Sequence, residues 1–352
     1  MSISSAINTA QSGLRVSGLR ADIVATNVAN ASTPGYVRRS VVLSETLLGG
    51  RTVGVSSTGV TRAEDSVLTT QRRALSGDVA QASLMASTWQ VLSSRLGDDA
   101  EGTGLFSKFS SFESALAASV ASPESGTQLA ALLDSANAVV KELNNLSTLV
   151  TQQRSEADRE IADGVDVVNT ALKKIEALNT QLTKMDRTTS EAAALMDERQ
   201  RTLDTIAEYL PIQAIPRENG KLDVVTVEGV YLVAGTAKQI EFTPGTSFGA
   251  AQTVGNGALS GLTVDGLNLT PGASSYAAVS GGMFGALFTL RDTDLPAFNA
   301  QIDMIAEDLV TRLSADSIDP TKTPGDFGLF VDTGTVGDPG LAGRIAINAQ
   351  ID

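Results

Sequence analysis

The sequence predicts a mainly α-helical protein with a β module: a long antiparallel helical bundle or rod, an N-terminal coiled-coil-like helix and a small β-rich domain. Apolar residues recur at three- and four-residue steps over most of residues 3–30, 63–96 and 105–210, which is the helical period. Alternating patterns at 37–62 and 211–235 predict strands instead. Only 4% of the 352 residues are aromatic while 42% are hydrophobic, so the cores should be aliphatic.

The first helix is expected over residues 3–30. Two glycines, Gly13 and Gly18, each lower its intrinsic stability by about 1 kcal/mol relative to alanine. A helix of this length with one apolar stripe needs a partner, so we expect it to be disordered in the isolated monomer. It ends before Tyr36, because Pro34 cannot continue a helix and Gly35 allows a sharp turn. The stripe is made of Ile3, Ile7, Ala10, Leu14, Ala21, Val24 and Val28.

The next segment, residues 37–62, predicts two extended stretches around Gly49 and Gly50, which favours a β-hairpin. A second helix follows from 63 to 96. Gly97 ends it, and Asp98, Asp99 and Glu101 then form an acidic turn. We interpret that turn as a solvated loop rather than a cation site, because it lacks EF-hand spacing.

Helical periodicity continues from Leu105 to Leu210, with a break at Ser122 and Pro123. We expect Ser122 to cap the following helix and Pro123 to open it. Apolar residues recur at helical spacing from Leu129 to Val150 and again from Ile161 to Met185. This pattern predicts a long antiparallel helical pair or rod.

Pro211 ends the helices, and the alternation that follows breaks at a hairpin turn, Glu228–Gly229. A returning helix is expected over 283–314, and the tail should hold two short strands among irregularly spaced aspartates. The predicted domains are 1–40, the N-terminal helix and turn; 41–210, a long helical domain with a short hairpin, completed by 283–314; 211–280, the β-rich module; and 315–352, a loop-rich tail.

The residue inventory argues against an enzyme. The chain has no His and no Cys, which removes the commonest general base, thiolate chemistry and the usual ligands of transition metals. It also shows no paired-carboxylate motif and no glycine-rich phosphate loop, so no catalytic residue, cofactor or metal is predicted. A carboxylate-based hydrolase and a helical protein without an assembly role stay open as distant alternatives.

The charge and hydropathy of the chain limit the kinds of partner that it can bind. Residues 1–75 carry eight arginines and four acidic residues, a balance of +4, so the remainder must carry −18 to give the net charge of −14. An acidic body argues against nucleic-acid binding. The chain has no run of 18 apolar residues and no N-terminal Sec signal, so we expect neither membrane insertion nor Sec export.

The segment Ala25–Arg39, which contains Asn27, Asn30 and Pro34-Gly35-Tyr36, resembles the signature of flagellar axial proteins, the subunits of rods, hooks and hook-associated structures. In this family the signature ends the N-terminal helix. The resemblance implies an assembly interface. We assign to it Ile3, Ile7, Leu14, Leu19, Asn27, Asn30, Pro34, Gly35 and Tyr36.

Two further segments, Leu195–Leu203 and Gly281–Asp292, resemble the hook-associated branch that joins hook and filament. That branch implies an extracellular subunit of the bacterial flagellum, exported through the flagellar type III pathway. Its partners would be the hook protein, the next hook-associated protein, further copies in a ring, and an export chaperone. A hook or distal-rod protein is the alternative. The resemblance also implies a second apolar helix at the C-terminus, which pairs with the N-terminal helix and lies in the region that meets the chaperone. This sequence ends without it, so we expect a truncated subunit.

Overall fold

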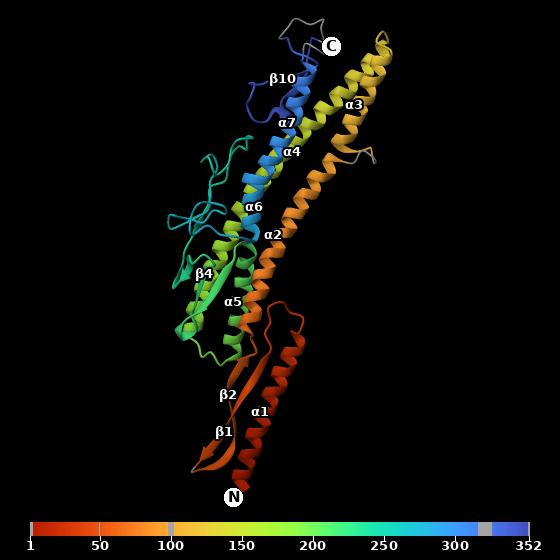
Figure 1. The fold of residues 1–352 in the computed structure, drawn as a ribbon. Coiled ribbons are helices and arrows are strands. Elements are labelled where there is room, and N and C mark those ends of the chain that lie inside the picture. Colours follow the sequence, from red (N-terminus) through yellow and green to blue (C-terminus); the bar gives the residue numbers. More distant parts are fainter. Residues whose placement is uncertain (1–2, 49, 98–101, 316–325, 351–352) are drawn as a thin grey trace.

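The computed structural model describes residues 3–48, 50–97, 102–315 and 326–350. The molecule is elongated, with its N-terminus at one end and residue 350 near the other (Figure 1). One helix and a two-stranded hairpin form the N-terminal end, which we call the arm (residues 3–62). The remaining helices form the body, and short strands lie along one side of it (Figure 1).

The arm consists of α1 (Ile3–Ala29), β1 (Arg39–Leu48) and β2 (Arg51–Arg62). The strands pair antiparallel, which confirms the predicted hairpin. The hairpin packs on a row of α1 formed by Val16, Leu19 and Ile23, of which Val16 and Ile23 are buried. This row was not predicted as a packing face, because the predicted stripe lies on the other side of the helix.

The body is built around α4, a continuous helix of 58 residues from Gly126 to Thr183. Of the predicted antiparallel pair or rod, the structure has the rod, because the apolar rows that begin at Leu129 and Ile161 both belong to α4; its helical neighbours include α3 and α5. The cap is also corrected: Ser125, not Ser122, accepts from the Gln128 backbone N–H, and Pro123 lies in the preceding turn. The other body helices are α2 (Ser66–Leu96), α3 (Gly104–Ala121), α5 (Ser190–Tyr209), α6 (Gly282–Thr289) and α7 (Leu295–Leu313).

Two hydrophobic clusters lie one after the other along α4. The first joins its C-terminal half to α5, α6 and the β module, and the second joins its N-terminal half to α2, α3, α7 and the tail. Between them, beside the π turn Leu290–Asp294, three charged side chains are buried. Arg291 pairs with Asp158 at 2.5 Å, and Arg154 Nε donates to the Arg291 carbonyl at 2.8 Å. Arg291 and Asp158 pair with each other, and Arg154 also donates to the Gly249 carbonyl at 2.8 Å, so each buried charge is hydrogen-bonded.

The β module has two small antiparallel sheets beside α4 (Figure 1). The predicted turn at Glu228–Gly229 is confirmed, because it lies between β4 and β5. The two tail strands are confirmed as well, as β10 (Phe330–Asp332) paired with β11 (Ile345–Ile347). The module's strands are β3 (Ile212–Pro216), β4 (Leu222–Thr226), β5 (Tyr231–Ala234), β6 (Thr236–Ala237), β7 (Ile240–Glu241), β8 (Thr263–Val264) and β9 (Leu267–Asn268).

Some sequence predictions fall outside the described residues, namely the acidic turn with Asp98, Asp99 and Glu101 and the tail aspartates 316 and 319. Of the remaining tail aspartates, Asp332 pairs with Arg344 at 3.2 Å. Within the described ranges, no helix is both long enough and apolar enough to cross a membrane.

Candidate assembly interface

The outward face of α1 is an uncovered apolar stripe. At about 100° of turn per residue, Leu14 lies nearly opposite the buried Val16, so the stripe points away from the hairpin. A helix that is apolar on two opposite faces is typical of one enclosed by partners on both sides. The exposed fractions are 82% for Ile3, 52% for Ile7, 72% for Leu14, 59% for Val24 and 72% for Val28.

The turn after α1 is held by Asn27. Its side-chain nitrogen donates to the Arg39 carbonyl at 2.8 Å, and its oxygen accepts from the Arg39 backbone N–H at 2.9 Å and from the Tyr36 hydroxyl at 2.8 Å. The Arg39 guanidinium also lies over the Tyr36 ring, 5.1 Å from its centre. One amide therefore fixes the end of α1, the turn and the start of β1 relative to one another.

The rest of the signature shapes the same turn. Asn30 donates to the Thr26 carbonyl at 3.0 Å and accepts from the Thr33 hydroxyl at 3.2 Å. Gly35 has a φ of +74°, a conformation that favours glycine, and a Cβ there would overlap the Arg201 side chain of α5. The turn thus contacts the body through a position that cannot carry a side chain without displacing its neighbour.

The arm joins the body at Asp197 of α5. Arg39 Nη2 and Arg62 Nε, one from each strand of the hairpin, donate to its two carboxylate oxygens at 2.9 Å each. The Asp197 side chain is only 3% exposed, so this carboxylate is enclosed by its two partners. A backbone bond from Val60 N to Thr188 O at 2.7 Å adds a second attachment.

A helical body with an N-terminal arm whose helix ends in this signature can be compared with known proteins. A family model described as "Flagellar hook-associated protein FlgK helical domain" matches residues 90–317. The chain belongs to the FlgK family. A second model, described as "Flagella basal body rod protein", matches residues 7–36, the part that includes most of α1 and the turn.

Relatives of the FlgK family support the assignment. "Flagellar hook-associated protein 1" of Escherichia coli (strain K12) is 25% identical over 307 residues, 83% of this chain and 53% of that protein. The protein of the same name from Salmonella typhimurium is 26% identical over 263 residues, 72% of this chain and 47% of that protein. The chain therefore spans about half the length of these curated relatives.

A solved structure shows the same fold. It is the flagellar hook junction protein FlgK from Burkholderia pseudomallei, which matches with a TM-score of 0.59 at 17% identity. The match covers 75% of this chain and 46% of that one.

The FlgK-family segment Leu195–Leu203 has a structural role. Besides Asp197, it supplies Arg199, whose Nη1 donates to Asn179 Oδ1 at 2.8 Å and to the Gly220 carbonyl at 2.7 Å. Burial, followed by the nearby Arg62 charge, lowers the pKa of Arg199 to about 10, so it stays protonated at neutral pH. This segment therefore connects the arm, α4 and the β module.

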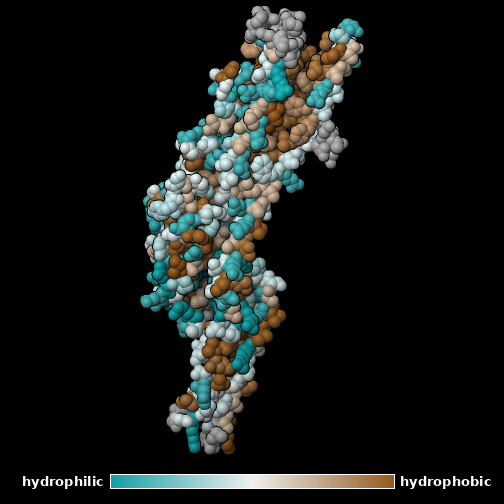
Figure 2. All heavy atoms as spheres, in the orientation of Figure 1, coloured by the Kyte–Doolittle hydropathy of each residue, from teal (hydrophilic) through white to brown (hydrophobic). Residues whose placement is uncertain are grey.

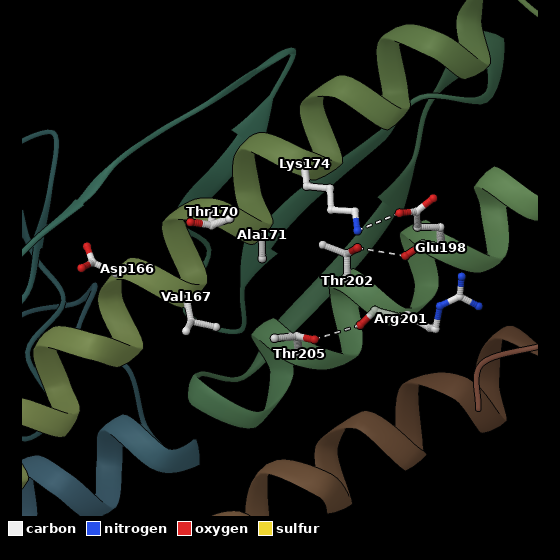
Figure 3. A pocket seen from close by; sticks show the side chains of 9 residues that line it. All are labelled: Asp166, Val167, Thr170, Ala171, Lys174, Glu198, Arg201, Thr202 and Thr205. Atoms are coloured by element: carbon white, nitrogen blue, oxygen red, sulfur yellow. Dashed lines mark hydrogen bonds and ion pairs between the residues drawn. The ribbon is translucent and has the colours of Figure 1, made fainter. Parts of the chain in front are cut away.

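A groove of about 500 Å³ lies between α4 and α5 of this FlgK-family chain (Figure 3). Its charged residues include Lys174 and Glu198, which pair at 2.7 Å, and the Thr202 and Thr205 hydroxyls bond carbonyls of their own helix. With these groups so engaged, the groove offers no activated nucleophile and base among its lining residues. Among the described residues, no group of three or more His, Cys, Asp or Glu could hold a metal ion.

The nine residues predicted for the interface divide into two groups. Ile3, Ile7 and Leu14 are exposed on the outward stripe, and Pro34 is exposed in the turn. Leu19 lies in the half-buried row against the hairpin, and Asn27, Asn30, Gly35 and Tyr36 build the turn. Sequence reasoning missed Val24 and Val28 as interface candidates, although they belong to the predicted stripe. It also missed Asp197 as a joint, because its partners are more than 130 residues away.

Proposed function

We propose that this chain is a non-enzymatic structural subunit of the bacterial flagellum that joins the hook to the filament. The observation that carries the proposal is the outward stripe of α1, an apolar face left open on a helix that ends in the axial-protein signature. The names of the curated relatives and the match of the helical body support the hook-associated branch over other axial subunits.

In this proposal α1 docks on neighbouring subunits through its stripe, and the turn and Asp197 set the angle of the arm. The partners are the hook protein on one side, the next hook-associated protein on the other, and further copies in a ring. Export occurs through the flagellar type III pathway with the help of a chaperone, and the subunit acts outside the cell. We propose residue 62 rather than 40 as the boundary of the N-terminal unit, because the hairpin packs on α1. We keep the helical body, the β-rich module and the tail as the other domains.

Deletion of the gene that encodes this chain tests the proposal. Electron microscopy should show hooks without filaments, and the wild-type gene should restore the filaments. A Leu14→Asp gene should fail to restore them, whereas a Leu14→Ile gene, which keeps the stripe apolar, should succeed. A strain without hooks would favour the alternative, a hook or distal-rod subunit. Filaments that persist in the deletion strain would contradict both.

A further inference from the structure

The segment between β7 and β8 has no regular secondary structure. We call residues 243–258 the strap; none of them lies in a helix or a strand, and none is buried. Val254 packs against the first hydrophobic cluster but is only partly buried, whereas Ile240 before the strap and Leu259 after it are buried. The side of the molecule where the β module lies shows a mixture of hydrophilic, intermediate and hydrophobic residues rather than one apolar surface (Figure 2). Apolar burial therefore contributes little to holding the strap in place.

Charged side chains of the body bind the strap through its main chain. Arg154 and Asp158 lie on α4, and Asp292 lies in the π turn. Their bonds join Gly245 N to Asp158 Oδ2 at 2.8 Å, Arg154 Nη1 to the Gly249 carbonyl at 2.8 Å, Arg154 Nη2 to the Gln252 carbonyl, and Val254 N to Asp292 Oδ1 at 3.2 Å. None of these bonds uses a side chain of the strap. The strap is thus attached to the body by charge-assisted bonds to three side chains.

The strap also borders a cavity of about 280 Å³ that lies between it, α4, α7 and the tail. Phe248, Gly249 and Ala250 form the strap's side of this cavity, and Arg154 and Arg344 are among the residues on its other sides. Part of the strap therefore faces a cavity rather than closely packed side chains. It gives up few dispersion contacts when it moves away.

Two of the charged groups that bind the strap are kept from water. Arg154 and Asp158 are 1% and 2% exposed. Removing charged groups from water is costly, and burial lowers the pKa of Arg154 below its ordinary value. When the strap lifts, these groups regain hydration, which offsets the loss of their bonds to its main chain. Opening the strap is therefore less costly than unfolding the body.

We propose that the strap opens as a unit while the helical body stays folded, and that it is a conformational switch that admits water to Arg154 and Asp158. The buried Ile240 and Leu259 are the fixed ends of the moving segment. Segments of this length without secondary structure are uncommon in compact domains and are often functional. Opening also withdraws Ala250 from the tail, so the β module gains freedom to move relative to the tail. This motion belongs to the chain itself and goes beyond the proposed assembly function.

Native-state hydrogen exchange at increasing urea concentrations tests the opening. After correction for intrinsic rates, the Gly245 and Val254 amides should exchange at the same rate, at least about a hundredfold faster than amides at residues 161–175 of α4. Their exchange should depend little on urea, because a local opening exposes little surface, whereas exchange in α4 should depend on it steeply. Different rates at Gly245 and Val254, or the rate and urea dependence of α4 at both, would overturn the proposal.

A reversible cross-link checks that the strap moves away from the tail. The chain has no cysteine, and a Cβ at Gly340 would lie 3.5 Å from the Ala250 Cβ, which is within the range of disulfides. In Ala250→Cys with Gly340→Cys, oxidation should slow exchange at Gly245 and Val254 at least about tenfold. The reduced form of the same variant is the matched control, because both forms carry the same backbone strain at residue 340. Unchanged exchange in the oxidised form, with the disulfide verified by mass, would contradict the proposal.

A charge variant tests the bonds that keep the strap closed. Arg154→Met removes the bonds to the Gly249 and Gln252 carbonyls and should speed exchange at Val254 at least about tenfold. Arg159→Met, at an exposed arginine of the same helix, is the matched control and should leave this exchange unchanged. Equal exchange in the two variants would refute the role of Arg154. The disulfide comparison alters no charged group, so it decides the matter if Arg154→Met does not fold.

Discussion

The arm and the body use helices with the same periodicity in opposite ways. Only Val16 and Ile23 are buried in α1, and its other apolar row faces outward. In α4 the apolar residues from Ala136 to Ile175 are buried in the two hydrophobic clusters, with the buried Arg154 and Asp158 between them. An apolar stripe therefore does not by itself indicate a core: in the body it stabilises the fold, and in the arm it is exposed on the surface that the described residues form.

The largest effect should come from the same substitution made once in each region. Leu172, fully buried on α4, becomes an unpaired buried charge in Leu172→Asp, which should lower the free energy of unfolding by about 5 kcal/mol or prevent folding. Leu14→Asp on the arm should leave it within about 0.5 kcal/mol of the wild type. Urea unfolding of both variants checks this. A strongly destabilised Leu14→Asp would show that the outward stripe is part of the chain's own core.

The joint between the two regions provides the next test. Asp197→Ala leaves the largely buried Arg39 without a carboxylate partner and leaves Arg62 with Glu64 alone, which should cost about 3 kcal/mol. Amide exchange should accelerate in β1 and β2 while the centre of α4 stays protected. Asp308→Ala removes an exposed pair with Arg312 and is the control, with an expected change below about 1 kcal/mol. Equal effects of the two variants would mean that Asp197 does not hold the arm.

A smaller effect is expected at the turn. Gly35→Val should cost about 1–2 kcal/mol for its left-handed backbone, and more because its side chain would meet Arg201. Gly50→Val is the matched control, because Gly50 has a φ of +76° but no atom within 4 Å of the position that a Cβ would take. Thermal unfolding measures both. We also expect Gly35→Val to impair incorporation into flagella more than folding, and the same loss in both assays would contradict this.

The smallest effect should be stabilising. Gly18→Ala adds a methyl group to α1 where no atom lies within 4 Å, so it should stabilise the helix by about 0.5–1 kcal/mol. In this variant, amide hydrogen exchange should slow in α1 and not in the other helices. In the wild-type chain, residues 3–29 should exchange faster than residues 155–185. In α2, Gly77→Ala should destabilise, because its Cβ would lie 2.8 Å from the Ala207 carbonyl oxygen. If exchange in α1 did not slow in Gly18→Ala, α1 would not be helical in the monomer.

Local patterns predicted most of the elements and few of their contacts. The period of α1, the break at Pro34 and the turn at Glu228–Gly229 depend on neighbouring residues, so the sequence carries them directly. The row at Val16 and Ile23 was missed because a glycine-containing helix with two apolar faces has a weak period. The continuity of α4 was missed because its charged middle, at Arg154 and Asp158, interrupts the apolar row; both side chains are buried through partners distant in sequence.

The continuity of α4 has a mechanical consequence. At about 1.5 Å per residue its 58 residues extend for about 87 Å, and both hydrophobic clusters are attached to this one element. A torque applied at one end of the body is therefore carried by an unbroken series of backbone hydrogen bonds, with no loop on the way that could absorb it. The arm is attached to α5 and to the loop before it, and not to α4 itself, through the two arginines on Asp197, the Val60–Thr188 bond and the turn at Gly35, so we expect bending to be concentrated at this joint. Under load the molecule should therefore bend at this joint rather than within α4.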